Sequence, residues 1–254
     1  MAVFVQGQAA AQDLKTFDWS GFYLGAQAGI VRAANSAALD YPDAAPASGY
    51  GFASNNLFYN GGVKDTGLPI LFGLNSLGSI GGLDAGFNVQ SGAFIFGLEG
   101  DVSSVDGTGT SRSAHSPSGH TSVSVTTGLD ALITARARTG IAVDRLMFFA
   151  TAGLAMGHSA IGTDLGYSDT GKSLAQAGAS SGFVPGLIGG VGAEYALNDK
   201  ISLKAESLYY WLEGQEAVAN GAGASGGSAA TAQPYSVDNG QSGVAVRAGI
   251  NVHF

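Results

Sequence analysis

Charged residues are scarce in this chain. Asp, Glu, Lys and Arg make up 12% of its 254 residues, about half the usual share for a soluble domain. Cysteine is absent, which excludes a disulfide framework, a zinc–thiolate site and a thiol nucleophile. Long apolar runs are also absent: none reaches the 18 residues of a membrane helix, and the longest, 146–156, is interrupted by Thr151 and Gly153. A membrane-spanning form of this chain must therefore be a closed barrel, because open sheet edges are not satisfied in lipid.

Glycine and apolar residues are abundant instead. The chain has 41 Gly residues, and 45% of its residues are hydrophobic. A barrel in lipid suits this composition, since its outer face needs no charge. The net charge of -8 and the pI of about 4.7 argue against a nucleic-acid partner, which would require a basic face.

Strict alternation of apolar and polar or small residues organises the chain, in segments of about ten residues. In the fourth segment, for example, Leu129, Ile133 and Ile141 lie on one face, and Arg136 and Arg138 on the other. We find eight such segments, which cover approximately residues 19–31, 79–90, 94–102, 128–143, 146–154, 183–197, 201–211 and 244–254. They predict an all-β fold: a closed, antiparallel, up-and-down transmembrane barrel of eight strands.

The connections between these segments alternate in length. Those after the second, fourth and sixth segments are a few residues long, and the others are long and rich in Gly, Ser, Ala and Asn. Short periplasmic turns and long extracellular loops are typical of outer-membrane barrels. A soluble barrel would need an apolar interior, whereas here the charged residues share a face with Gly. The first loop, 32–78, is unusually long, and an added hairpin there would give ten strands.

Several segments resemble a known family. These are WSGFYLGAQAGI from Trp19, RARTGIAVDRLMFFATAGLAMG from Arg136, VGAEYALNDKISLKAESLYYWL from Val191 and the ending VRAGINVHF. Together they resemble the OmpA-like β-barrel porin family of alphaproteobacteria, the outer-membrane immunogenic or haemin-binding proteins. The resemblance implies a barrel at residues 19–254 in the outer membrane of a Gram-negative cell. Residues 1–18, which have a short apolar patch and small residues at Ala9 and Ala11, are expected to be a leader or signal-peptide remnant.

The resemblance also implies partners. They are outer-membrane lipid, lipopolysaccharide and the barrel-assembly machinery. The terminal Phe254, with the alternating apolar residues before it, looks like the recognition signal of that machinery. A homo-oligomer and a surface ligand stay open. In function it implies a structural or interaction protein that displays surface loops. The alternatives are a narrow pore for small solutes, or a surface receptor for haemin or a host ligand.

Three motifs that usually indicate catalysis or nucleotide binding lack their structural context. GYSDTGKS at 166–173 matches a P-loop, GAGASG at 221–226 a dinucleotide fingerprint and GASSG at 178–182 a nucleophile elbow. Each motif requires an adjoining helix, and none is predicted in these Gly-rich segments. We therefore expect no enzyme, and no metal or cofactor. His115 and His120 are weak candidates for haem ligation, although two solvated loop histidines explain them better.

The inward face of the alternation carries the predicted site. Four acidic and four basic residues share it: Glu99, Asp101, Glu194, Glu206, Arg136, Arg138, Lys204 and Arg247. Adjacent segments would pair Glu99 and Asp101 with Arg136 and Arg138, and the other four residues would form a second group. Because an unpaired buried charge is very costly, we expect these ion pairs to fill the lumen. The aromatic residues Trp19, Tyr23, Tyr195, Tyr209, Tyr210 and Trp211 lie near segment ends and are expected at the membrane interfaces.

Overall fold

The structure is a computed structural model of the chain, and twelve strands lie in its described part. That part comprises residues 17–40, 50–53, 57–60, 63–66, 71–106, 109–115, 120–169, 172–225 and 235–254. Most of the expected leader at 1–18 lies outside it. The described residues contain no helix long and apolar enough to cross a membrane.

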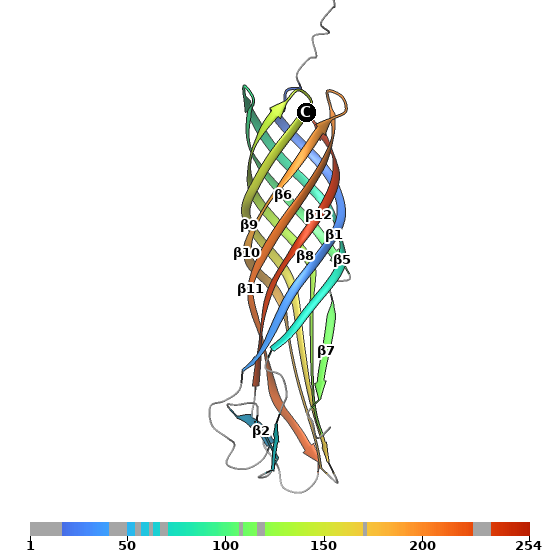
Figure 1. Ribbon diagram of the computed structural model, residues 1–254, viewed down its shortest axis with the longest axis vertical. Helices are drawn as coiled ribbons and strands as arrows, with labels where there is room; N and C mark the ends of the chain where they lie inside the picture. The colour runs from blue at the N-terminus through green and yellow to red at the C-terminus, as the bar shows by residue number, and fades with distance from the viewer. Residues whose placement is uncertain are drawn as a thin grey trace, which may run out of the picture.

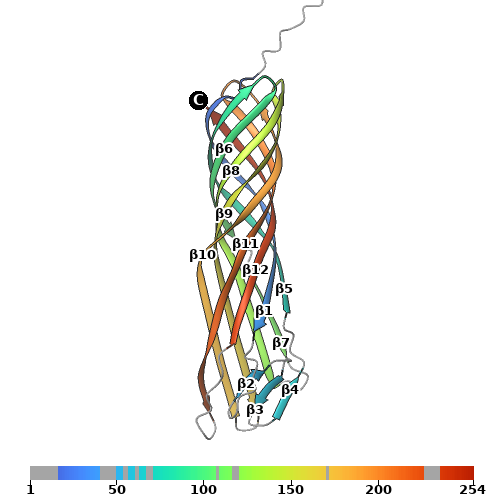
Figure 2. The ribbon, with the colours of Figure 1, turned by 90° about the vertical axis from the view of Figure 1, so that its left-hand side faces the viewer.

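Eight long strands close into a barrel (Figures 1 and 2). In order around the wall they are β6, β5, β1, β12, β11, β10, β9 and β8, and the pairing of β6 with β8 completes the ring. All neighbouring pairs are antiparallel, so the eight-stranded prediction is confirmed. Their bounds are β1 Gly21–Asp40, β5 Leu71–Ser91, β6 Phe94–Asp106, β8 Thr121–Val143, β9 Leu146–Asp169, β10 Lys172–Ala196, β11 Ile201–Ser225 and β12 Tyr235–His253.

The remaining four strands do not enlarge the ring. β7 (Thr110–His115) pairs with the outer part of β8, beyond the end of β6. β2 (Tyr50–Ala53), β3 (Leu57–Asn60) and β4 (Val63–Thr66) form a separate three-stranded sheet. It lies far from the short turns that join β5 to β6, β8 to β9 and β10 to β11 (Figure 2). The ten-stranded alternative is therefore wrong, because the first loop forms its own sheet.

The barrel strands are much longer than the ten residues expected. Seven of the eight have between 19 and 25 residues, whereas crossing a bilayer takes about 9–11. Much of the expected first loop is therefore strand: β1 runs on to Asp40, and β5 already begins at Leu71.

Polarity reverses along the strands, and β8 shows the reversal most clearly. In the part of β8 nearer the short turns, Ile133 and Ile141 face outward, and Arg136 is buried. In the part farther from those turns, Val123 and Val125 are buried instead, and the polar residues that alternate with them lie on the opposite face. The barrel is thus apolar outside in one half and apolar inside in the other.

A β-bulge separates these two halves of β8. The register with β9 shifts between Leu129 and Ala131, which leaves Asp130 as the extra residue. An extra residue changes which side chains face inward, so Leu129, predicted to face lipid, is buried in the lumen. The alternation on either side of Asp130 is regular, but the two stretches are out of phase.

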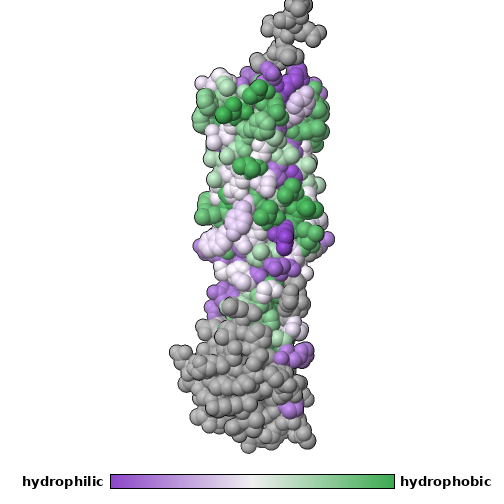
Figure 3. Space-filling view, viewed as in Figure 1, coloured by the Kyte–Doolittle hydropathy of each residue, from purple (hydrophilic) through white to green (hydrophobic). Residues whose placement is uncertain are grey.

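The apolar outer band adjoins the short turns (Figure 3). Exposed Phe22, Phe94 and Phe148 lie toward those turns, and exposed Phe183 and Trp211 lie toward the other edge. Aromatic residues at both edges of an apolar band are typical of an outer-membrane barrel. We call the half of the barrel beyond this band the extension. Its interior is an apolar cluster that includes Leu39, Phe72, Leu74, Val123, Ile161 and Val237, and its outer wall carries mainly small and polar residues.

The short turns lie at the end of the barrel that holds the C-terminus (Figure 1). One of them uses Asp144, whose φ of 53° is a left-handed conformation that Asp tolerates better than most residues. In another turn the Asn198 side chain accepts hydrogen bonds from the backbone N–H groups of Lys200 and Ile201.

The absence of cysteine makes this topology directly testable. Single cysteines at Gly109→Cys, in the extension, and Asp199→Cys, in a short turn, would be the only thiols. A membrane-impermeant maleimide should label Gly109→Cys on intact cells and Asp199→Cys only after permeabilisation. The reverse pattern would show that the barrel has the opposite orientation.

The end of the chain supports a second prediction. The Phe254 side chain is 76% exposed on the outer wall, while its N–H donates to the Phe22 carbonyl at 2.9 Å. Deleting Phe254 should lower the amount of inserted barrel in cells, as measured by heat-dependent mobility in gels. Refolding in detergent should remain largely intact, since only one hydrogen bond is lost. Normal insertion of the deletion variant in cells would contradict an assembly role for Phe254.

Candidate functional site: the charged lumen

The eight predicted charged residues all lie in the lumen, each no more than 5% exposed. They come from β6, β8, β10, β11 and β12, on the half of the barrel that carries the apolar band. Regular alternation places them there, because residues two apart on a strand share a face.

Arg136 occupies the centre of the cluster. Its guanidinium contacts Glu99, lies 3.0 Å from Asp101 Oδ2 and lies 3.1 Å from Glu206 Oε2. Three carboxylates from β6 and β11 thus surround one cation. A planar guanidinium with five N–H donors is suited to several partners at once.

Arg138 lies one step nearer the short turns. It approaches Glu194 Oε2 at 2.9 Å and Glu99 Oε2 at 3.3 Å, and it donates to the Tyr23 hydroxyl at 2.8 Å. The Phe149 ring packs against its guanidinium carbon, 4.2 Å from the ring centre. Arg138 therefore links a carboxylate of β6 to a carboxylate of β10.

Arg247 and Lys204 complete the set of buried cations. Arg247 lies 3.0 Å from Asp101 and 2.7 Å from Glu206, and Lys204 lies 3.0 Å from Glu99. The expected pairing in two separate groups is therefore wrong: the eight residues form one network. In the ring β6 and β11 are opposite each other, and the barrel is narrow enough for their side chains to meet across it.

The network includes residues outside the predicted eight. Asp84 binds Lys204 at 2.7 Å, Tyr23 donates to Glu99 at 2.6 Å, and Ser202 and Asn251 donate to Glu194 at 2.5 and 2.7 Å. Asp84 and Asn251 do lie on the inward face of the alternation, so that pattern could have identified both. With Asp84, five buried carboxylates face four buried Lys and Arg side chains.

Apolar layers close the network at both ends. Toward the short turns is a cap of Phe17, Trp19, Ile95, Met147, Phe149 and Ala196. On the other side lies a layer that includes Val31, Ile80, Leu132, Leu208 and Leu212. His253 lies between the cap and the network: its ring packs against Trp19, and its Nε2 lies 3.4 Å from Glu194 Oε1.

The expected interfacial position is wrong for three of the six aromatic residues. Trp19, Tyr23 and Tyr210 are buried in the lumen, whereas Tyr195, Tyr209 and Trp211 are exposed on the outer wall. Tyr209, Tyr210 and Trp211 are consecutive, so alternation alone sends the middle one inward. Trp19 precedes β1 and folds over the end of the lumen.

The weak haem candidates lie in the extension. His115 ends β7, His120 precedes β8, and both are exposed. The P-loop-like segment 166–173 lies across the ends of β9 and β10, and residues 178–182 lie within β10. Residues 170, 171 and 226 of these motifs are outside the described residues. Within the described part of the chain, no group of three or more His, Cys, Asp or Glu residues could hold a metal ion.

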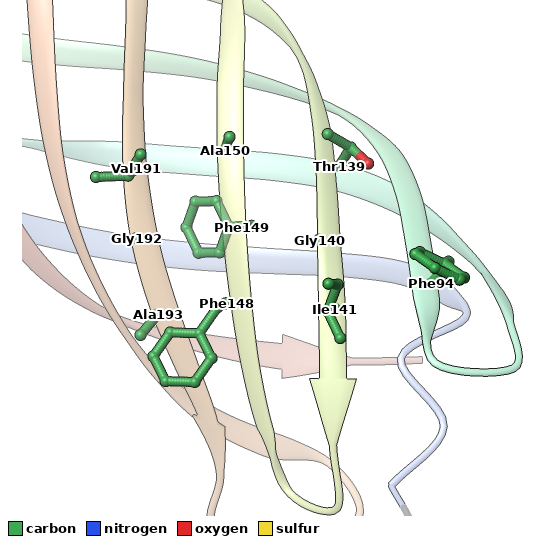
Figure 4. A pocket seen from close by; sticks show the side chains of 10 residues that line it. All are labelled: Phe94, Thr139, Gly140, Ile141, Phe148, Phe149, Ala150, Val191, Gly192 and Ala193. Atoms are coloured by element: carbon green, nitrogen blue, oxygen red, sulfur yellow. The ribbon is translucent and has the colours of Figure 1, made fainter.

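A shallow hollow of about 650 Å³ lies on the outer wall (Figure 4). Its lining includes Phe94, Ile141, Phe148 and Val191 around the small side chain of Ala150. These residues belong to the apolar band, so lipid is the environment of this hollow.

The network predicts a large effect of removing one cation. Arg138→Ala should lower the free energy of unfolding by about 3 kcal/mol, because buried carboxylates lose their partner. Denaturant unfolding of protein refolded in detergent would measure it. The matched control is Arg145→Ala: this half-buried side chain pairs with the exposed Asp199 at 3.6 Å and donates to the Ala196 and Leu197 carbonyls, and its loss should cost no more than about 1 kcal/mol. Equal effects of the two substitutions would contradict a tightly coupled network.

Comparison with known proteins agrees with this architecture. A family model described as "Outer membrane protein beta-barrel domain" matches residues 1–247. The chain is 30% identical over 202 residues to the 31 kDa outer-membrane immunogenic protein of Brucella melitensis biotype 1, covering 78% of this chain and 73% of the relative. The same values hold for the protein of that name from Brucella suis biovar 1.

Similar solved structures include the outer membrane protease OmpT of Escherichia coli and OprG of Pseudomonas aeruginosa. OmpT has a TM-score of 0.45 at 8% identity, covering 92% of this chain and 97% of that one. OprG has a TM-score of 0.42 at 12% identity, covering 94% and 99%. From the family match and the Brucella relatives, this chain belongs to the outer membrane protein beta-barrel domain family and lies in the outer membrane.

Proposed function

We propose that this protein is a non-catalytic structural and interaction protein whose barrel is sealed and whose extension displays surface loops. The buried network of five carboxylates and four cations, closed by apolar layers on both sides, is the observation that carries this proposal.

Sealing follows from the energetics of the lumen. A permeating ion would have to displace paired charges, and a buried charge that loses its partner costs several kcal/mol. It would also have to pass the apolar layer at Leu132, Leu208 and Leu212, whose side chains are no more than 1% exposed. An eight-stranded barrel is just wide enough for its side chains to fill.

Further side-chain layers continue the filling into the extension. Gln241 contacts Ser159, and Asn239 donates to Thr127 at 2.8 Å. Beyond them lies an apolar cluster that includes Phe72, Leu74, Val123 and Ile161. The extension thus has a packed core of its own, which supports loops at a distance from the bilayer.

Display is the second part of the proposal. β10 and β11 each have 25 residues, which corresponds to about 80 Å along the strand. About half of that length lies within the apolar band, whose outer edge is at Phe183 on β10 and at Trp211 on β11. The Brucella relatives are named as immunogenic, and this chain would likewise present its distal loops to the cell's surroundings.

The surroundings of the wall suggest the partners. The apolar band would contact membrane lipid, and the polar wall of the extension would contact lipopolysaccharide. The terminal Phe254 would be read by the barrel-assembly machinery. No cofactor is part of this proposal, which gives exposed His115 and His120 no role in haem ligation.

Conductance in a planar bilayer tests the sealed lumen. Refolded wild-type protein should show no steady channels, whereas a sixteen-stranded porin inserted under the same conditions serves as the positive control. Insertion of the silent protein must be verified by protease protection of the reconstituted bilayer. Large, stable channels would overturn the sealed-barrel proposal in favour of a narrow pore for small solutes.

A further inference from the structure

Asp84 has fewer partners than the other carboxylates of the network. Glu99, Asp101 and Glu206 each contact at least two cations, and Glu194 contacts Arg138 and three further polar side chains. Asp84 binds only Lys204, through Oδ2, and Lys204 is shared with Glu99. Its Oδ1 is buried and accepts no hydrogen bond from the described residues.

A second buried oxygen faces the same place. Asn251 donates its Nδ2 to Glu194 Oε1 at 2.7 Å, which fixes the amide so that Oδ1 points away from Glu194. That Oδ1 is also buried, again without a partner among the described residues. Both side chains are at most 3% exposed.

Gly25 lies between the two oxygens. A Cβ placed on Gly25 would lie 2.1 Å from Asn251 Oδ1 and 2.8 Å from Asp84 Oδ1. The two acceptors therefore converge on the small space that the missing side chain leaves. Acceptors with no donor between them carry an unfavourable electrostatic energy in a low-dielectric interior.

The charges of the network indicate which ligand relieves this unfavourable electrostatic energy. Five carboxylates against four Lys and Arg side chains leave one negative charge uncompensated, and Asp84 is the carboxylate with the fewest partners. A divalent ion would replace this deficit with an excess of positive charge. A small monovalent cation restores neutrality and binds oxygen ligands at short distances.

We infer that Asp84 Oδ1 and Asn251 Oδ1, converging at Gly25, bind one small monovalent cation such as Na⁺ within the lumen. The ion is a structural component of the network rather than a permeating solute. It enters during folding, and the cap and the apolar layer then hold it inside.

Sodium content and cation-dependent stability test this site. Protein is refolded in detergent in NaCl or in choline chloride at equal ionic strength, because a sealed lumen exchanges its ion slowly. After desalting into sodium-free buffer, the protein refolded in NaCl should retain close to one Na⁺ per chain by elemental analysis and release it on heating in SDS. Its unfolding constant should fall by about tenfold for each tenfold rise in Na⁺ above the dissociation constant.

Two matched variants locate the ion. Asp84→Asn keeps the shape of the side chain but removes its charge, so both the retained Na⁺ and the cation dependence should disappear. Thr134→Val also keeps the shape of its side chain and removes a buried hydroxyl that donates to Asp101 in the same network; because all five carboxylates remain, it should keep both. If one of the variants does not fold, the sodium content of the wild-type protein still decides the matter.

Two results would overturn the inference. Wild-type protein that retains no Na⁺ and is equally stable in both salts would assign the two oxygens to a water molecule, a proton on Asp84 or charge compensation by His253. Retained Na⁺ that persists in Asp84→Asn would place the ion elsewhere in the barrel.

Discussion

The pairing of charges removed from water is the constraint on which the rest of this structure depends. Arg136 lies between Glu99, Asp101 and Glu206, and none of these side chains has an alternative partner in solvent. Such pairing requires that opposite walls of the barrel lie within reach of each other. The small circumference of eight strands meets that requirement.

Polarity along the strands follows from a second constraint, the change of surroundings at the membrane boundary. Within the bilayer the outer wall must be apolar, so charge is confined to the interior. Beyond it the wall meets water, and apolar residues such as Val123 and Val125 become the interior. The bulge at Asp130 is where β8 changes phase between the two regimes.

Much of this arrangement could be predicted from the sequence, because alternation of Leu, Ile and Phe with Gly and charged residues is unambiguous within the bilayer. Beyond the bilayer that contrast is lost: residues 33–38, AANSAA, differ little between the two faces, so the sequence does not distinguish the outer part of β1 from a loop. Leu129 was assigned to the wrong face because nothing in the sequence marks the bulge. The joining of the two charge groups was missed because contacts across a lumen depend on its diameter, which alternation does not encode.

The reversal of polarity also separates two kinds of selection on the same strands. A substitution on the outer face within the apolar band is constrained by lipid, and one at the network is constrained by charge. On the outer face of the extension, the exposed Asp164 meets neither constraint, because the core that supports it is made by the side chains of the opposite face. Under the proposed display function, mutation could therefore change the surface presented there while insertion and barrel stability are preserved.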